Sequence, residues 1–239
     1  MSRGDTTIGD VKKEISGSVE QKASSVLERL ASMRDSGKRI FLSSSFQSQS
    51  LPLLHIVSRF PGTIPVVFLD TGYLFPETLA FRDEIADRLG LQVINVRPSV
   101  PKSEQRTPEG LLLFAADTEK CCFLNKVRPL EPYLRSFDVW ISGVRSDQSA
   151  VRAGFEMEQA GPHGILRYHP MLDWTAREVH AYRKTHDLPE HPLERCGYLS
   201  IGCMPCTRPF MDSLGERGGR WSGQSKTECG LHTELGSSE

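Results

Sequence analysis

Five of the six cysteines in this chain stand in arrangements that favour chemistry over simple packing. Two adjacent thiols, Cys121 and Cys122, and two thiols separated by Met-Pro, Cys203 and Cys206, form two pairs. Four thiolates that converge from short segments can hold an iron–sulfur cluster or a zinc ion. Cys229 lies apart from both pairs in a polar, glycine-bearing segment, where we expect a reactive thiol. The sequence therefore predicts a metal centre together with a separate thiol nucleophile.

The composition is that of an ordinary globular protein, and it narrows the range of partners. The 239 residues, 38% hydrophobic and 25% charged, suffice for one large domain with a hydrophobic core. A net charge of −1 gives no electrostatic reason to expect nucleic-acid binding. No apolar run approaches the roughly 20 residues that cross a bilayer, and the charged N-terminus is unlike a signal peptide. We expect a cytoplasmic protein with reduced cysteines and no membrane partner.

Apolar runs alternate with amphipathic stretches along the chain. Strands are predicted at 39–42, 64–69, 91–96, 139–142 and 165–169, and helices at 19–33, 51–60, 76–89, 118–137 and 175–187. The last helix begins at a capping box, in which Thr175 is followed three residues later by Glu178. Buried strands that alternate with helices indicate an α/β fold, a mostly parallel, Rossmann-like sheet with helices on both faces.

Three segments of different character follow from the same pattern. Residues 1–17 are polar and aperiodic, which predicts a loose lead-in. Residues 18–207 contain all the predicted strands and form the α/β domain. Residues 208–239 are polar and rich in glycine without a core pattern, so we expect a mobile tail, which carries Cys229.

Polar residues follow three of the predicted strands, at 43–45, 70–72 and 143–145. In parallel α/β folds ligands bind beyond the carboxyl ends of the strands, so these exits predict a site. The serine-rich loop at 43–50 joins a strand to a helix start and suits a phosphate or sulfate group. From the residues alone, a capped loop with redundant serines is equally compatible. The loop is not a Walker motif, because it lacks the glycines and the lysine.

An ordered set of motifs makes the chain resemble the assimilatory sulfonucleotide reductases, most closely the iron–sulfur adenosine phosphosulfate reductases of bacteria. The motifs cover nearly the whole chain beyond residue 38: Ser-Ser-Ser-Phe at 43–46, Leu-Asp-Thr-Gly-Tyr at 69–73, Cys-Cys-Phe-Leu-Asn-Lys-Val-Arg-Pro-Leu at 121–130, Gly-Val-Arg-Ser-Asp-Gln-Ser at 143–149, Pro-Met-Leu-Asp-Trp-Thr at 170–175, Ser-Ile-Gly-Cys-Met-Pro-Cys-Thr at 200–207 and Glu-Cys-Gly-Leu-His at 228–232. The resemblance implies an adenine nucleotide alpha hydrolase-like form of the α/β fold.

The resemblance also assigns roles. It implies that one [4Fe–4S] cluster is bound by Cys121, Cys122, Cys203 and Cys206, and that Cys229 attacks adenosine 5′-phosphosulfate to give an S-sulfocysteine and AMP. Thioredoxin or a glutaredoxin-like dithiol would then release sulfite. The implied substrate-binding residues are Ser43, Ser44, Ser45, Leu69, Asp70, Thr71, Gly72, Lys126, Gly143, Arg145, Arg152, Arg217, Arg220 and His232.

Two positions depart from the pattern of these reductases. Residues 47–50 read Gln-Ser-Gln-Ser where the family often has Gly-Ala-Glu-Asp, so a glycine and two acids are missing. Asn125 stands where the family often has an arginine, directly before Lys126.

Three alternatives remain open at this point. The substrate could be 3′-phosphoadenosine 5′-phosphosulfate, although reductases devoted to it typically lack the paired cysteines. A pyrophosphate-releasing ATPase for sulfur transfer would share the fold type but would carry a Ser-Gly-Gly-x-Asp-Ser loop, which residues 43–50 lack. A zinc-stabilised binding module would use the same four thiols without catalysis.

Overall fold

One mixed sheet forms the centre of the protein. The computed structural model describes residues 8–209, 219–221, 226 and 228–233, and the side chains of 8–14, 232 and 233 are not included in that description. Within these residues six strands pair in the order β3-β2-β1-β4-β6-β5. Their bounds are β1 Ile40–Ser43, β2 Val66–Leu69, β3 Val93–Val96, β4 Val139–Ser142, β5 Glu158–Ala160 and β6 Leu166–Tyr168. All neighbours are parallel except β5, which pairs with β6 in the antiparallel sense.

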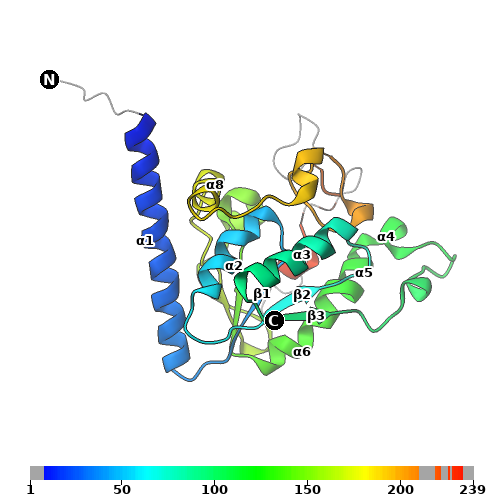
Figure 1. Ribbon diagram of the computed structural model, residues 1–239. Coiled ribbons are helices and arrows are strands. Elements are labelled where there is room, and N and C mark those ends of the chain that lie inside the picture. The colour runs from blue at the N-terminus through cyan, green and yellow to red at the C-terminus, as the bar shows by residue number, and fades with distance from the viewer. Residues whose placement is uncertain (1–7, 210–218, 222–225, 227, 234–239) are drawn as a thin grey trace.

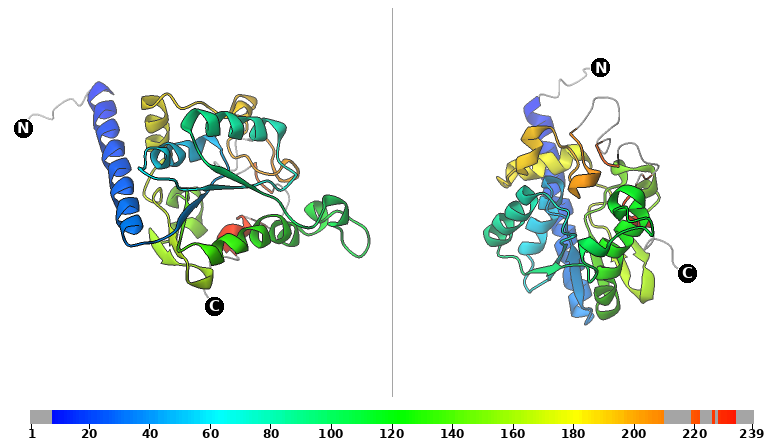
Figure 2. Two further views of the ribbon diagram at one scale, coloured as in Figure 1. Left: turned by 60° about the horizontal axis from the view of Figure 1, so that its bottom comes forward. Right: turned by 90° about the vertical axis from the view of Figure 1, so that its right-hand side faces the viewer.

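Helices cover both faces of this sheet (Figures 1 and 2). Their bounds are α1 Ile8–Asp35, α2 Leu51–Ser58, α3 Pro76–Leu89, α4 Leu113–Ala116, α5 Thr118–Cys122, α6 Arg128–Ser136, α7 Ala150–Ala153, α8 Ala176–Thr185 and α9 Gly230–Thr233. Figure 2 shows α2 and α3 on one face of the sheet, with α5 and α6 on the other. The predicted α/β class is therefore confirmed.

Alternation along the strands explains the two-sided core. In β1 the side chains of Ile40 and Leu42 join one apolar cluster, whereas Phe41 between them joins a second cluster on the opposite face. In β4 Ile141 and Trp140 divide in the same way. Successive strand side chains point to opposite faces, so a strand that is apolar throughout must be covered on both sides.

Helix α1 is longer than the sequence analysis predicted. It begins at Ile8, so residues 8–17, expected as a loose lead-in, are helical, and Figure 1 shows the first turns of α1 standing away from the body. From Val19 to Met33 its inner face is buried against the core. Extending a helix that packing already holds costs little, because nucleation is the unfavourable step, and no core pattern is needed to extend it.

Two further differences concern regular structure. Residues 118–137, expected as one helix, form α5, a five-residue π-helix (η3, Phe123–Val127) and α6. Strand β5 was not predicted, because Glu158–Ala160 has no apolar pattern. It is held by pairing with β6 and by Arg29 of α1, whose guanidinium binds both carboxylate oxygens of Glu158 at 2.5 and 2.7 Å. Edge strands are often stabilised by neighbours of this kind.

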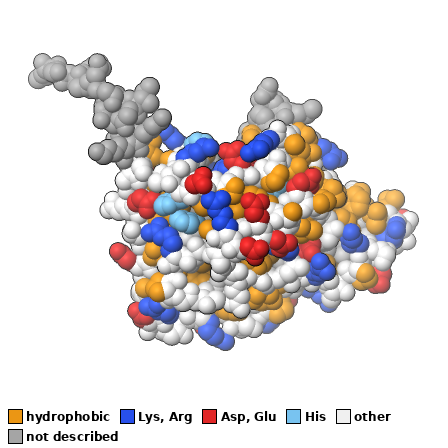
Figure 3. Space-filling model, in the orientation of Figure 1, with side chains coloured by type: hydrophobic (Ala, Val, Ile, Leu, Met, Phe, Trp, Pro, Cys, Tyr) orange, Lys and Arg blue, Asp and Glu red, His pale blue; other side chains and the backbone are white. Residues whose placement is uncertain are grey.

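The surface carries charges of both signs. In the orientation of Figure 3, acidic and basic side chains are interspersed over the face that is shown. Among the described residues no helix is both long and apolar enough to span a membrane.

Candidate active site

A cavity of about 200 Å³ opens where the strand order reverses, between β1 and β4. Ligands of open α/β sheets bind at this switch point, beyond the carboxyl ends of the strands. Most of the predicted substrate-binding residues meet here. The cavity is lined by Ser43, Ser44, Ser45, Leu69, Thr71, Lys126, Gly143, Arg152, Arg220 and Cys229, together with residues from outside the prediction.

Three of the predicted substrate-binding residues, Asp70, Gly72 and Arg145, lie near the cavity without lining it. The Asp70 carboxylate accepts hydrogen bonds from the Gly72 amide and from Arg97 Nε, so it shapes the loop after β2. Burial raises the pKa of Asp70, but the Gly72 and Arg97 bonds outweigh it and lower the pKa below its usual value. Arg145 is buried and donates to Asp147 and Gln49. Arg217 and the His232 side chain lie outside the described residues, so their roles stay predictions.

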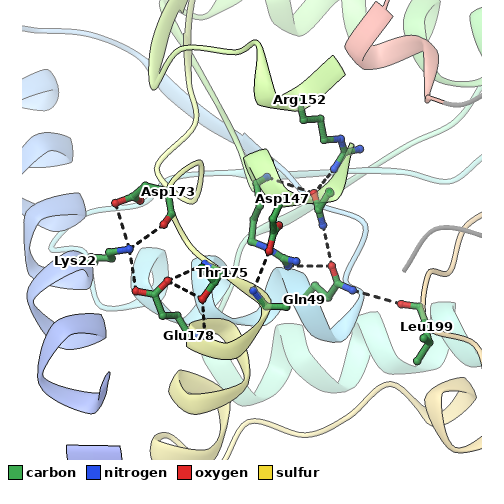
Figure 4. Close-up of polar contacts among 11 residues, drawn as sticks. Lys22, Gln49, Asp147, Arg152, Asp173, Thr175, Glu178 and Leu199 are labelled. Atoms are coloured by element: carbon green, nitrogen blue, oxygen red, sulfur yellow. Dashed lines mark hydrogen bonds and ion pairs between the residues drawn. The ribbon is translucent and has the colours of Figure 1, made fainter. Parts of the chain in front are cut away.

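The two unusual glutamines of the serine loop connect it to the segment before Cys203. Gln47 Oε1 accepts a 2.8 Å hydrogen bond from the amide of Ile201. Gln49 Nε2 donates to the carbonyl of Leu199 at 3.4 Å, as Figure 4 shows. Gln49 Oε1 accepts from Arg145 and Gln148. Both glutamines line the cavity. The substitutions that depart from the family pattern are therefore structural links across the cavity.

Further polar contacts hold the loop that follows β1. Trp140 Nε1 donates to Ser43 Oγ at 2.7 Å, which joins β4 to the end of β1. The Phe46 amide donates to Ser44 Oγ, and Phe46 adopts a left-handed conformation with its ring fully buried. The serine loop thus begins with defined hydroxyl positions, as binding of an oxyanion requires.

The four paired cysteines surround a second, smaller cavity beside the first. It is lined by Cys121, Cys122, Cys203 and Cys206, with the aromatic residues Tyr73, Phe114 and Trp221. Burial, followed by the other three thiols, raises the pKa of Cys121 to about 12. Burial likewise raises the pKa of Cys122 and of Cys206. In an apolar pocket each of these thiols disfavours the ionisation of the others. A bound cationic group would therefore be needed to stabilise them as thiolates.

Secondary structure explains how residues distant in sequence reach this second cavity. The segment after β2 forms a β-bridge between Leu74 and Cys203, and the Met204 amide donates to the Tyr73 carbonyl at 2.7 Å. Thr71 Oγ1 lies 3.2 Å from Cys203 Sγ. On the other side, Asn125 of the π-helix donates to the Cys121 carbonyl at 2.8 Å and to its Sγ at 3.5 Å.

The predicted nucleophile lies beside Lys126, a predicted substrate-binding residue that lines both cavities. Lys126 Nζ lies 3.7 Å from Cys229 Sγ. Burial raises the pKa of the Cys229 thiol, but Lys126, a backbone hydrogen bond at Leu231 and Arg220 together bring it below its usual value. Burial lowers the pKa of Lys126, but the sulfurs of Cys229, Cys203 and Cys122 outweigh it and raise it. The arrangement favours an ammonium beside a thiolate.

Arg220 approaches the site from the described part of the tail. Its guanidinium lies against Trp221, donates to the Cys206 carbonyl and rests over Gly202, where any side chain would collide with it. Residues 200–202 and Gln148 also line the cavity, although the sequence analysis did not select them. Residues 200–202 stand directly before Cys203 and Gln148 stands three residues after Arg145, and these positions are the signal that could have found them.

Solved structures of other proteins share this fold. The fold resembles a phosphoadenylyl-sulfate reductase from Candida auris (TM-score 0.64, 20% identity, 78% of this chain and 94% of that chain). It also resembles the FMN adenylyltransferase of Candida glabrata (TM-score 0.60, 15% identity, 95% of this chain and 81% of that one). At these identities the likeness shows the fold alone, which is an α/β fold with a mostly parallel sheet.

Sequence comparison then identifies the family. Residues 39–209 match the model of the phosphoadenosine phosphosulfate reductase domain. Proteins named adenosine 5′-phosphosulfate reductase are 41% identical in Salinibacter ruber (80% of this chain, 76% of that one) and 40% identical in Chelativorans (79% and 77%). A protein named phosphoadenosine 5′-phosphosulfate reductase in Gloeobacter violaceus is 38% identical (82% and 83%). The chain belongs to the phosphoadenosine phosphosulfate reductase domain family.

Proposed function

We propose that this protein reduces adenosine 5′-phosphosulfate to sulfite and AMP. The observation that carries the proposal is the Cys229 thiol on the wall of the switch-point cavity, beside the Lys126 ammonium. A nucleophilic thiol must be a thiolate, and a neighbouring cation both favours that state and neutralises an anionic substrate. The names of the relatives support the same reaction.

In the first step the Cys229 thiolate attacks the sulfur of the phosphosulfate. A bond forms between the two sulfurs, the bond from sulfur to the phosphate oxygen breaks, and AMP leaves with that electron pair. Lys126 and Arg220 line the cavity with Cys229, so their charges would stabilise the negative charge that moves onto the phosphate. The hydroxyls of the serine loop would hold the nucleotide from the other side.

In the second step a reduced dithiol regenerates the enzyme. One thiolate of the dithiol attacks Cys229 Sγ, sulfite leaves with the electrons of the sulfur–sulfur bond, and a mixed disulfide remains. The second thiol of the same donor then displaces Cys229, so the donor is oxidised to a disulfide. We propose thioredoxin or a glutaredoxin-like protein as this donor.

We propose that Cys121, Cys122, Cys203 and Cys206 bind one [4Fe–4S] cluster. The four thiols border one cavity and come from two short segments. A cluster suits such a set, because it takes one thiolate on each of its iron atoms. When bound, the cluster would supply structural and electrostatic support to the cavity beside it.

The proposal is tested by Cys229→Ser, with Cys196→Ser as the matched control. Cys196 is an exposed thiol outside both cavities. Incubation with adenosine 5′-phosphosulfate without a dithiol should add one SO₃ group, about 80 daltons, to Cys229 in the parent and in the control. Cys229→Ser should show no adduct and no sulfite release. Normal turnover in Cys229→Ser would refute the assignment.

A second substrate is supported by two comparisons. The relative in Gloeobacter violaceus is named for the 3′-phosphorylated nucleotide, and so is the family model. We propose the unphosphorylated nucleotide as the preferred substrate, because the resemblance associates the paired cysteines with it. The pyrophosphate-releasing ATPase is set aside, since the chain belongs to the reductase domain family.

A further inference from the structure

We infer that Glu228 is a positioning residue. Its buried ion pair with Arg152 holds the C-terminal segment at residues 228–233 against the body of the protein, so that Cys229 lines the cavity. This ion pair must break before the dithiol reaches Cys229. The inference rests on the proposed function for its second half. Its first half, the fastening itself, concerns only the described residues and can be tested without substrate.

The Glu228 carboxylate is fully engaged by the body of the protein. Arg152 Nε donates to Oε2 and Arg152 Nη2 donates to Oε1, both at 2.9 Å. Ser149 Oγ also donates to Oε2, at 3.0 Å. The side chains of Arg152 and Glu228 are 9% and 1% exposed. A bidentate, charge-assisted pair removed from water is strong and specific in its geometry.

Hydrogen bonds to other residues of the protein body fix the position of the Arg152 side chain. Its Nη1 donates to Gln148 Oε1, and Gln148 Nε2 donates to Gln49 Oε1 at 2.8 Å. Figure 4 shows Arg152 at one end of this network and Leu199 at the other. The amide of Arg152 also donates to Ser149, the N-cap of α7. The guanidinium orientation is therefore determined by the walls of the cavity.

The same carboxylate positions the nucleophile directly. Glu228 Oε1 accepts a 2.9 Å hydrogen bond from the backbone amide of Cys229. The orientation of the peptide that carries the thiol is thus coupled to Arg152. Two other contacts attach the segment independently: Lys226 pairs with Glu119 of α5, and Leu231 packs against the apolar cluster under α6. These contacts should let the segment stay near the body when Glu228 is changed.

The second step of the reaction conflicts with this fastening. A protein dithiol must reach Cys229 Sγ along the line of the sulfur–sulfur bond, on the side away from the leaving sulfite. Cys229 lines a cavity and is only partly exposed, and its neighbour Glu228 is buried, so the segment must move outward for a protein partner to approach. The ion pair should therefore favour the first step and oppose the second.

The pair also bears on the role predicted for Arg152. Its Nε and Nη2, the two atoms that would form a bidentate contact with a phosphate, are both occupied by Glu228. While the ion pair is formed, Arg152 therefore binds Glu228 rather than a phosphate of the nucleotide.

The experiment uses the full-length protein and Glu228→Gln, which keeps the shape of the side chain and removes its charge. The first readout is the rate at which iodoacetamide alkylates Cys229 without substrate, followed by peptide mass spectrometry. The rate is read on its high-pH plateau, where the thiol is a thiolate in every variant. We expect alkylation to accelerate roughly ten- to hundredfold, which corresponds to the loss of a hydrogen-bonded charge pair.

The matched control is Glu158→Gln, which removes another bidentate pair with an arginine, at the surface far from the tail in sequence. It should leave the alkylation rate unchanged. Ser149→Ala keeps both charges and removes one hydrogen bond to Glu228, so it should accelerate alkylation only about three- to tenfold. This variant keeps the test decisive if Glu228→Gln does not fold.

The second readout separates the two half-reactions. In single turnover, Glu228→Gln should form the S-sulfocysteine about tenfold more slowly than the parent, while excess reduced dithiol should release sulfite at least as fast. Unchanged alkylation in both Glu228→Gln and Ser149→Ala, or equal slowing of both half-reactions, would overturn the inference. If the parent forms no adduct, the proposed function fails, but the alkylation result still decides whether Glu228 fastens the segment.

Discussion

The ammonium of Lys126 lies 3.7 Å from the sulfur of Cys229, although 103 positions separate the two residues in the chain. The π-helix that carries Lys126 follows directly after Cys122, and α9 begins directly after Cys229 and packs against that π-helix. One cation therefore faces both the nucleophile and the paired cysteines. π-Helical turns are frequent at functional sites, where they redirect side chains.

Replacing Lys126 by Met should move the activity to higher pH. Lys126 lowers the pKa of Cys229, so without it the thiol ionises only at higher pH, and less thiolate is present at neutral pH. We expect the pH profile of Cys229 alkylation to move upward, and turnover near neutral pH to fall roughly 10²-fold. Lys184→Met, which changes an exposed lysine paired with Glu190, serves as the control. An unchanged alkylation profile would exclude an electrostatic role for Lys126.

Metal analysis of the purified protein should find about four iron atoms and four acid-labile sulfides per chain. Cys203→Ser should lose most of this iron and the associated visible absorption, whereas Cys196→Ser should keep both. Treatment with an iron chelator should release the metal and lower the melting temperature, since metal binding stabilises the fold that holds it. One zinc ion per chain without sulfide would instead favour the zinc-stabilised binding module.

Kinetic comparison of the two sulfonucleotides should favour the one without a 3′-phosphate. Among the described residues, the cations that line the cavity are Lys126, Arg152 and Arg220. Lys126 faces Cys229, Arg152 is paired with Glu228, and Arg220 donates to the Cys206 carbonyl, so none of these described cations is dedicated to a further phosphate. We expect kcat/KM for adenosine 5′-phosphosulfate to be at least about tenfold higher, or roughly 1.4 kcal/mol. Equal values would contradict this preference.

Asn125, which stands where related reductases often have arginine, should stabilise the fold through Gln105. The two buried amides exchange hydrogen bonds of 2.7 and 2.9 Å, and this pair attaches the loop before α4 to the π-helix. Each single change to alanine should lower the free energy of unfolding by about 1–3 kcal/mol, because it leaves the other amide unsatisfied. The double variant should lose less than the sum.

Urea denaturation of the four proteins measures this coupling. Gln92→Ala, which shortens an exposed side chain directly before β3, should cost well under 1 kcal/mol. Strictly additive losses at positions 105 and 125 would mean that the two amides do not act as a pair.

The sequence predicted the strands well because their apolar runs leave little choice of structure. The runs at 139–142 and 64–69 must be buried on both faces, and they became β4 and β2. Strand β5 could not be predicted, because Glu158–Ala160 is stabilised by neighbours rather than by its own pattern. The π-helix was missed because five residues are too few to separate its period from that of an α-helix.

The candidate site was predicted unevenly for similar reasons. Thiols, serines and cations have recognisable chemistry, so the sequence could select Cys229, Lys126 and the serine loop, which line one cavity in the structure. Gln47 and Gln49 carry no charge, and their role depends on the distant backbone at 199 and 201, which sequence spacing cannot place. Glu228 stands next to Cys229 in the sequence, but its partner Arg152 is 76 positions away, so only the folded chain reveals the pair.

The part of the chain that matches the family model is shorter than the part that the hydrophobic core needs, because helix α1 lies outside the match. The family match begins at residue 39, after α1 has ended, and it stops before Cys229. Val19, Ala23, Val26, Leu30 and Met33 of α1 are each at most 4% exposed. Burial of such side chains contributes on the order of 5–10 kcal/mol, comparable to the whole stability of a domain. A fragment of residues 39–209 should therefore expose a large apolar surface and aggregate. Expression of the protein should retain helix α1.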